Sequence, residues 1–232
     1  MWGAWPRNTE MSCGSGTSIV VFASGKGTNF RALCEAAQSS RLSVRIVGLV
    51  TNVSDAGAAT IAREFGVPVI DVPHAGLKRE AHEQAVLHAL EGVKHEWAVL
   101  AGYMRLFTPA FIRKYYDEKL KCARVVNIHP SLLPAFAGAD GYAQALRYGV
   151  KLTGATVHLV GDGLDDGPIV AQRAIDVRDD DTESLLVSRG LKVEHELYVE
   201  TLQKLLTSSW RLVSGNEPNG RLRVLFEGGL KR

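Results

Sequence analysis

Residues 18–29 read SIVVFASGKGTN, a short apolar run that leads directly into a glycine-rich turn. A run of this kind, rich in β-branched residues, is typical of a buried strand. The stretch that follows, Asn29–Gln38, has the spacing of an amphipathic helix. Glycines in such a turn let backbone N–H groups approach an anion, and a helix start favours negative charge. Strand, turn and helix in this order predict the first unit of an α/β sheet.

The same alternation continues outward from this stretch. The predicted strands are Ser18–Ala23, Val44–Thr51, Val67–Asp71, Trp97–Ala101, Arg124–Asn127, Gly154–Val160 and Ile169–Val177. The predicted helices are Asn29–Gln38, Gly57–Phe65, Lys78–Leu90, Pro109–Tyr116, Tyr142–Tyr148 and Thr182–Leu206. Near-continuous apolar strands separated by helices indicate an α/β fold with a mostly parallel, twisted sheet and helices on both faces. Sites in such sheets lie beyond the carboxyl ends of the strands.

The domain organisation is expected to be simple. A chain of 232 residues is compatible with one domain, which we place at residues 18–209, with halves 18–126 and 127–209. Residues 1–17 are polar and rich in glycine and serine, and are expected to be a disordered leader or an expression remnant. Residues 210–232 form a C-terminal tail with an expected edge strand at Leu222–Phe226.

Composition narrows the classes of partner. The chain has 27 basic and 25 acidic residues, and a net charge of +2 gives no electrostatic footprint for nucleic acid. Three widely spaced cysteines predict neither a disulfide framework nor a zinc site, so no metal is expected. No apolar run approaches the ~20 residues of a membrane helix. We expect a cytoplasmic protein, monomer or homodimer, acting on small molecules.

The glycine turn at Ser24–Asn29 has a spacing that excludes two common nucleotide motifs. A dinucleotide fingerprint would need glycine at the position of Phe30, and a phosphate-loop NTPase motif would need one at Val20. A short turn suited to a single phosphate remains, beside the alternative of a strand-to-helix turn with no ligand.

A second informative stretch is Asn127-Ile-His129-Pro130. Asn127 and His129 lie two residues apart, so an extended chain projects both side chains to one face. An amide donor beside an imidazole suits stabilisation of an oxyanion, and histidine can carry a proton near neutral pH. The alternative is a histidine that only caps the strand end.

An acidic loop, Gly161–Pro168, follows the next strand. It lacks the residue order of an EF-hand calcium loop, and it is compatible with a solvated turn. A carboxylate beside an imidazole would orient the ring and favour its charged form. Which of its aspartates would do so is left open by the sequence.

Taken together, these stretches resemble the phosphoribosylglycinamide formyltransferases, within the folate-dependent formyltransferases. The resemblance covers about Ser18 to Leu206 and implies a Rossmann-like formyltransferase fold. It rests on SGKGTN (24–29), AGYMRL (101–106), NIHPSLLP (127–134), GVKLTGATVHLV (149–160) and GLDDGPIVAQ (163–172).

The resemblance implies roles for particular residues. The implied catalytic residues are Asn127, His129 and Asp165. The residues implied to bind the phosphate and ribonucleotide are Gly25, Lys26, Gly27, Thr28, Asn29, Arg79 and Glu194. The residues implied to contact folate are Met104, Arg105, Leu106, Asn127, Val160, Gly161, Asp162, Gly163, Leu164 and Asp165. The chain departs from the family pattern at Asp140, Tyr142, Gly161, Gly163 and Leu191.

The implied reaction is direct transfer of the formyl group from 10-formyltetrahydrofolate, as co-substrate, to the amine of 5-phosphoribosylglycinamide in purine biosynthesis. One alternative is a formyltetrahydrofolate deformylase, which uses the same three residues with water as acceptor but usually carries an N-terminal regulatory domain, for which residues 1–17 are too few. Methionyl-tRNA formyltransferase needs a C-terminal tRNA-binding domain that residues 207–232 do not provide. A catalytically inactive nucleotide-binding module would be expected to lose Asn127, His129 or Asp165.

Overall fold

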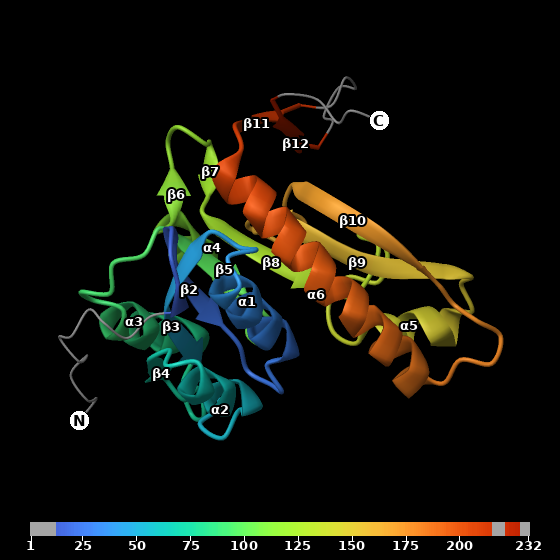
Figure 1. Cartoon of the computed structure of the whole chain (residues 1–232), viewed down its shortest axis with the longest axis horizontal. Coiled ribbons are helices and arrows are strands. Elements are labelled where there is room, and N and C mark those ends of the chain that lie inside the picture. The colour runs from blue at the N-terminus through green and yellow to red at the C-terminus, as the bar shows by residue number, and fades with distance from the viewer. Residues whose placement is uncertain (1–12, 215–220, 228–232) are drawn as a thin grey trace. The chain divides into compact units, whose positions relative to one another are not determined.

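The computed structural model describes residues 13–214 and 221–227. The chain divides into two compact units, Met1–Tyr115 and Tyr116–Arg232. Figure 1 shows the elements of both along the chain, from blue at the N-terminus to red at the C-terminus.

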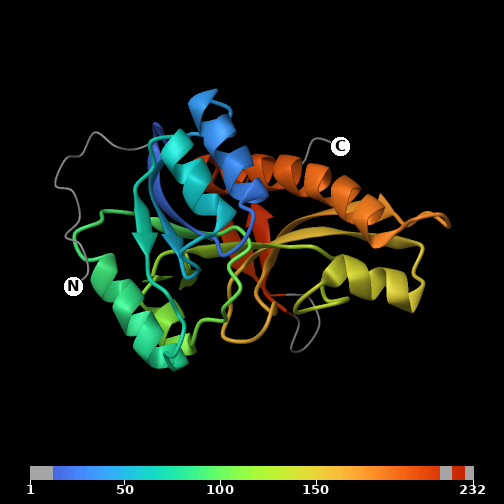
Figure 2. The ribbon, with the colours of Figure 1, turned by 90° about the horizontal axis from the view of Figure 1, so that it is seen from below.

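The first unit is a mostly parallel sheet with helices on both faces. Its strands are β1 (Cys13–Gly14), β2 (Thr17–Phe22), β3 (Val44–Thr51), β4 (Val69–Asp71) and β5 (Trp97–Leu100), and its helices are α1 (Thr28–Gln38), α2 (Gly57–Glu64), α3 (Arg79–Ala89) and α4 (Pro109–Arg113). β2 pairs in parallel with β3 and β5, and β4 pairs in parallel with β3. Helices α1 and α2 cover one face and α3 lies on the other (Figure 2). The predicted α/β class is confirmed.

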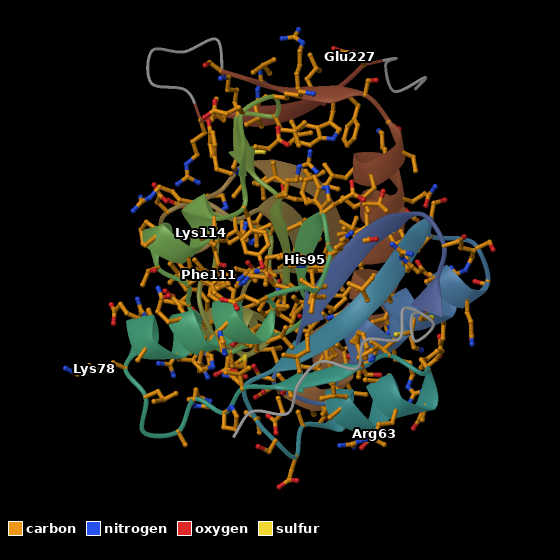
Figure 3. All side chains as sticks on the ribbon, turned by 90° about the vertical axis from the view of Figure 1, so that its left-hand side faces the viewer. Arg63, Lys78, His95, Phe111, Lys114 and Glu227 are labelled. Atoms are coloured by element: carbon orange, nitrogen blue, oxygen red, sulfur yellow. The ribbon has the colours of Figure 1, made fainter. Side chains whose placement is uncertain are left out.

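Burial explains why these segments form strands and helices. Ile19–Phe22 of β2 are completely buried, as expected for a strand covered on both faces. Helix α1 buries Phe30, Leu33 and Cys34 at helical spacing. Figure 3 shows Phe111 within the side-chain core of this unit, whereas Arg63 and Lys78 project from its surface.

The second unit is built on an antiparallel sheet. Its strands are β6 (Tyr116–Asp117), β7 (Cys122–Ala123), β8 (Val125–His129), β9 (Leu152–Leu159), β10 (Ile169–Asp176), β11 (Trp210–Val213) and β12 (Arg223–Phe226), and its helices are α5 (Gly141–Tyr148) and α6 (Glu183–Thr207). β9 pairs antiparallel with both β8 and β10. Helix α6 packs across β9 and β10 and against α5 (Figure 1). The short 160–168 connection makes β9 and β10 a hairpin, because a parallel crossover needs a dozen or more residues.

The two ends of the chain differ in detail from the sequence expectations. Residues 13–17, assigned to a leader, are ordered: Cys13 and Gly14 pair antiparallel with Ile46 and Arg45 of β3. Residues 1–12 of that segment lie outside the described residues. The expected tail strand at Leu222–Phe226 corresponds to β12, which pairs with β11 in a two-stranded sheet of its own. The predicted helix Pro109–Tyr116 ends at Arg113.

Helix α6 is 25 residues long and carries charged side chains along its length. Within residues 13–214 and 221–227, no helix combines the length and apolarity needed to cross a membrane.

Candidate active site

The glycine turn of the first unit requires glycine at one position. Gly27 has φ 76°, and a Cβ placed there would lie 2.7 Å from the Cα of Ala58, which is closer than real Cβ atoms approach. The turn is also fixed by Ala58 N, which donates to Gly25 O at 3.1 Å. Among the described residues, no side chain caps α1 at Gly27. Gly25 and Lys26 are exposed, Thr28 is half-buried and Asn29 is buried. This geometry suits an anion at the helix start.

A hydrogen-bond network joins this turn to the loop after β5. Ser24 Oγ donates to Asn52 Oδ1 and accepts from Met104 N at 2.8 Å, while Ser24 N donates to Gly102 O at 3.0 Å. Ser24, Asn52 and Gly102 follow β2, β3 and β5, so the network fixes the carboxyl edge of the parallel sheet.

The loop after β5 presents apolar side chains to solvent. Met104 is 72% exposed and Leu106 is 50% exposed, which is unusual for two large apolar residues so close in sequence. Between them, the Arg105 guanidinium donates to Leu77 O at 2.9 Å. Arg79 is exposed at the first residue of α3.

In the second unit, strand pairing places Asn127 and His129 on one face at the end of β8. The antiparallel register sets Asn127 opposite His158 of β9, and His129 opposite Thr156. Residues directly opposite in such a pair have neighbouring side chains. Accordingly, Asn127 Nδ2 lies 3.1 Å from His158 Nε2.

The loop after β8 is held on the sheet by polar contacts. Thr156 Oγ1 donates to Ser131 O at 2.6 Å and accepts from Leu133 N at 3.0 Å. Gln172 Nε2 also donates to Leu133 O at 2.8 Å. The loop then returns toward the strand, so that Phe136 O lies 2.9 Å from His129 Nε2.

His129 faces a hydrogen-bond acceptor at each ring nitrogen. Its Nδ1 lies 3.3 Å from Asp165 Oδ2, with side-chain exposures of 5% and 12% respectively. A doubly protonated ring in this place would donate a hydrogen bond to both the carbonyl and the carboxylate.

Asp165 is the aspartate that contacts the imidazole. Its backbone is left-handed, with φ 49°, and its Oδ2 also accepts from Gly138 N at 2.9 Å. Asp166 instead accepts from Gly163 N at 3.1 Å and so shapes its own loop. Asp165 and not Asp166 is therefore the loop carboxylate beside His129, a choice that the sequence left open.

His158 is a member of this cluster that sequence reasoning did not assign to the site. Burial lowers the pKa of His158, outweighing the opposite effects of the Leu159 carbonyl and Asp165. The neutral ring donates from Nδ1 to Leu159 O at 3.0 Å, so Nε2 accepts from the amide of Asn127. One N–H of that amide is used in this way. The sequence signals were its place on the predicted strand Gly154–Val160 and within the stretch GVKLTGATVHLV (149–160).

The remaining candidates are distributed over both units. Gly25–Asn29, Arg79 and Met104–Leu106 belong to the first unit, and the other candidates belong to the second. In the loop after β9, Val160 and Gly161 are half-buried, while Asp162, Gly163 and Leu164 are exposed. Glu194 is 4% exposed on α6 and accepts a hydrogen bond from Tyr142. Within the described residues, no group of three or more His, Cys, Asp or Glu side chains could hold a metal ion.

Comparison with known proteins assigns this arrangement to a family. The family model described as formyl transferase matches residues 17–202. The chain belongs to the formyl transferase family, and it is an enzyme of formyl transfer.

Within that family, the similarity is to the phosphoribosylglycinamide formyltransferases. A protein of that name from Bacillus subtilis is 38% identical over 81% of this chain and 94% of its own, and one from Mycobacterium tuberculosis is 40% identical over 88% and 91%. The crystal structure of glycinamide ribonucleotide transformylase 1 from Symbiobacterium toebii superposes with TM-score 0.80 at 35% identity, covering 90% of this chain and 94% of that one.

A formyltetrahydrofolate deformylase from Pseudomonas syringae is also similar. Its structure gives TM-score 0.78 at 27% identity and covers 91% of this chain but 66% of the deformylase. This relative is more distant in sequence than the formyltransferases.

Proposed function

We propose that this enzyme transfers the formyl group of 10-formyltetrahydrofolate to the amine of 5-phosphoribosylglycinamide, giving formylglycinamide ribonucleotide and tetrahydrofolate in purine biosynthesis. The observation that carries the proposal is the cluster of Asn127, His129 and Asp165, in which an amide and an imidazole lie on one strand face and a carboxylate lies beside the imidazole. Its support also includes the similarity to the named formyltransferases over most of the chain.

The 5′-phosphate of the ribonucleotide is assigned to the glycine turn. Gly25, Lys26, Gly27, Thr28 and Asn29 offer backbone N–H groups at the start of α1 and one exposed cation. Such a helix start attracts a phosphate through its N–H groups and its dipole. Arg79 and Glu194 are assigned to the rest of the ribonucleotide, on the resemblance to the family.

The folate co-substrate is assigned to two further segments. Met104 and Leu106 offer exposed apolar side chains to a flat ring system, with Arg105 between them. In the other unit, Val160, Gly161, Asp162, Gly163 and Leu164 precede Asp165, so folate held by this loop would have its formyl group next to the catalytic cluster.

In the proposed reaction, the amine nitrogen bonds to the formyl carbon and the carbonyl electron pair moves to oxygen. The tetrahedral intermediate then reforms the carbonyl as the bond to N10 of the folate breaks. The amine loses one proton and N10 gains one, so no net charge is created. Asn127 and His129 would stabilise the oxyanion by hydrogen bonding.

Each group has a definite part in this scheme. Asn127 uses one amide N–H for His158 and would direct the other at the oxyanion. The Nε2 proton of His129 is bonded to Phe136 O, and the formyl oxygen would replace that carbonyl as acceptor. Asp165 lies beside the ring, which it would orient, and it would assist proton transfer from the amine toward N10. Holding two substrates together also contributes, since effective molarities are worth about 7–11 kcal/mol.

We further propose that the enzyme acts in the cytoplasm on these small molecules, as a monomer or homodimer. All three cysteines, Cys13, Cys34 and Cys122, are described and are buried free thiols, which suits a reducing compartment.

The test is a spectrophotometric assay of tetrahydrofolate release from 10-formyltetrahydrofolate, with and without 5-phosphoribosylglycinamide. Release that depends on the ribonucleotide is expected. Release at the same rate without it would contradict the proposal and favour the deformylase alternative.

A further inference from the structure

Tyr142 makes a hydrogen bond that a core residue does not need. It is 4% exposed and packs in an apolar cluster with Ile175 and Leu186. A phenylalanine would fill the same space without a polar group to satisfy. The Tyr142 hydroxyl donates to Glu194 Oε1 at 2.8 Å, and Glu194 is itself only 4% exposed. The polar contact of the Tyr142 hydroxyl is therefore its hydrogen bond to the Glu194 carboxylate.

Helix α6 is shaped to admit the ring. Gly190 lies one turn before Glu194, on the same face of the helix. A Cβ at Gly190 would overlap Cζ of Tyr142, so the ring lies against bare backbone at this point. Glycine inside a helix costs about 1 kcal/mol relative to alanine. The close approach of the Tyr142 ring explains why glycine occupies position 190.

In this hydrogen bond the proton stays on Tyr142. Burial and the neighbouring Glu194 carboxylate both raise the pKa of Tyr142, so the phenol keeps its proton near neutral pH. A proton shared in this direction stabilises the carboxylate at one oxygen and fixes its orientation. A buried carboxylate is otherwise costly, and an apolar side chain would often serve stability as well.

Glu194 lies on the face of α6 that meets the catalytic strand. Tyr198, one turn further on, donates through its hydroxyl to Val126 O at 3.2 Å, next to Asn127. β8 runs beneath α6 in the opposite direction (Figure 1), so one turn back from Tyr198 leads toward the Asn127–His129 end of the strand. A carboxylate held there can meet a substrate whose amine attacks the formyl carbon at that end.

We infer that Tyr142 is a positioning residue for the ribonucleotide, holding the Glu194 carboxylate in the orientation that binds the glycinamide or ribose part of the substrate. The inference rests on the proposed function, which assigns Glu194 to that part. The inference adds Tyr142 as a residue that does not touch the ribonucleotide but affects how tightly the enzyme binds it. Its signature is a change in the KM for the ribonucleotide, with the KM for the folate and kcat little changed.

The principal experiment compares Tyr142→Phe with Tyr198→Phe in the full chain. Both remove a buried hydroxyl. The Tyr142 hydroxyl donates to the Glu194 carboxylate, whereas the Tyr198 hydroxyl donates to the backbone carbonyl of Val126. Tyr142→Phe is expected to raise the KM for 5-phosphoribosylglycinamide about tenfold, the size typical of a lost hydrogen bond to a charged group. Tyr198→Phe is expected to change it less than about twofold. Similar increases in both variants would overturn the inference.

A second comparison asks whether Tyr142 acts through Glu194. In a Glu194→Ala background, adding Tyr142→Phe should leave the KM for the ribonucleotide within about twofold, because the group that the hydroxyl positions is gone. Additive effects would contradict the inference. Gly190→Ala keeps the hydroxyl but displaces the ring, and it should raise the same KM. Thermal unfolding of each variant establishes that it is folded at the assay temperature.

Assays of the unsubstituted enzyme distinguish a failure of the proposed function from a failure of the inference about Tyr142. If its turnover does not depend on the ribonucleotide, the proposed function fails and the inference falls with it. If its turnover does depend on the ribonucleotide but Tyr142→Phe leaves the KM unchanged, the inference alone is wrong.

Discussion

His129 Nδ1 lies 3.3 Å from Asp165 Oδ2, while the opposite nitrogen of the ring lies 2.9 Å from Phe136 O. Asp165 reaches this place from a left-handed backbone conformation, which costs energy for a residue other than glycine. The strain is tolerated where the carboxylate meets the imidazole. This relationship is the basis of the first two predictions.

Asp165→Asn should lower kcat by about 10²–10⁴-fold, the range for loss of a group that controls proton transfer. The amide can still occupy the position, but it carries no negative charge and cannot take up a proton. Steady-state kinetics with both substrates would measure the effect. The matched control is Asp166→Asn, one residue along the chain, whose carboxylate bonds Gly163 N and not the imidazole. Equal losses in the two variants would count against the assigned role of Asp165.

His129→Ala should lower turnover by about 10²–10⁴-fold, because the proposed oxyanion donor and the partner of Asp165 are removed. Binding of the ribonucleotide should barely change, since its phosphate is assigned to the glycine turn. Isothermal titration calorimetry with 5-phosphoribosylglycinamide, beside the kinetic assay, would report the two separately. Near-normal turnover would remove His129 from its role.

Gly27→Ala should weaken ribonucleotide binding and destabilise the fold by roughly 1–3 kcal/mol. The reasons are a φ of 76° and the overlap of the new Cβ with Ala58. Denaturant unfolding and ribonucleotide titration would measure both effects. Gly25→Ala is the control for stability, because a Cβ there meets nothing within 4 Å. A fully stable Gly27→Ala variant would show that the turn adapts more freely than its geometry indicates.

His82 should make stability depend on pH. Its ring is completely buried on α3, its Nε2 lies 2.8 Å from Val72 O, and its Nδ1 has no partner among the described residues. Burial lowers the pKa of His82 below its ordinary value of 6.5. As pH falls through that value, the unfolded chain takes up a proton that the folded chain does not. Stability should therefore fall, by up to about 1.4 kcal/mol per pH unit.

The variant that tests this is His82→Phe. It should cost about 1–2 kcal/mol at pH 7.5, because Val72 O loses its donor, yet show a weaker loss of stability between pH 7.5 and 5.5. Urea unfolding at the two pH values gives the comparison. His88→Gln, at an exposed histidine on the same helix, should leave the pH dependence unchanged. An unaltered pH dependence in His82→Phe would contradict the assignment.

The sequence predicted those features that depend only on residues close together in the chain. The apolar run before Ser24 and the glycines after it fixed the first strand, turn and helix. The two-residue spacing of Asn127 and His129 predicted their common face on β8. These follow from periodicity and from the conformational freedom of glycine, which neighbours in the sequence decide.

Features that depend on distant packing could not be predicted in this way. The carbonyl of Phe136 carries no sequence signature, and its place beside His129 depends on contacts of Ser131 and Leu133 with Thr156. The choice of Asp165 over Asp166 depends on backbone conformation. The bond between Tyr142 and Glu194 joins residues 52 positions apart and needs the space left by Gly190.

The fate of the formyl carbon tests the central claim most directly. The enzyme would be given 10-formyltetrahydrofolate labelled with ¹³C in the formyl group, together with 5-phosphoribosylglycinamide, and the products separated by mass. We predict that the label appears in formylglycinamide ribonucleotide, in equal amount to the tetrahydrofolate released, with little free formate. Label recovered as formate in that amount, with the ribonucleotide unlabelled, would make water the acceptor and contradict the account.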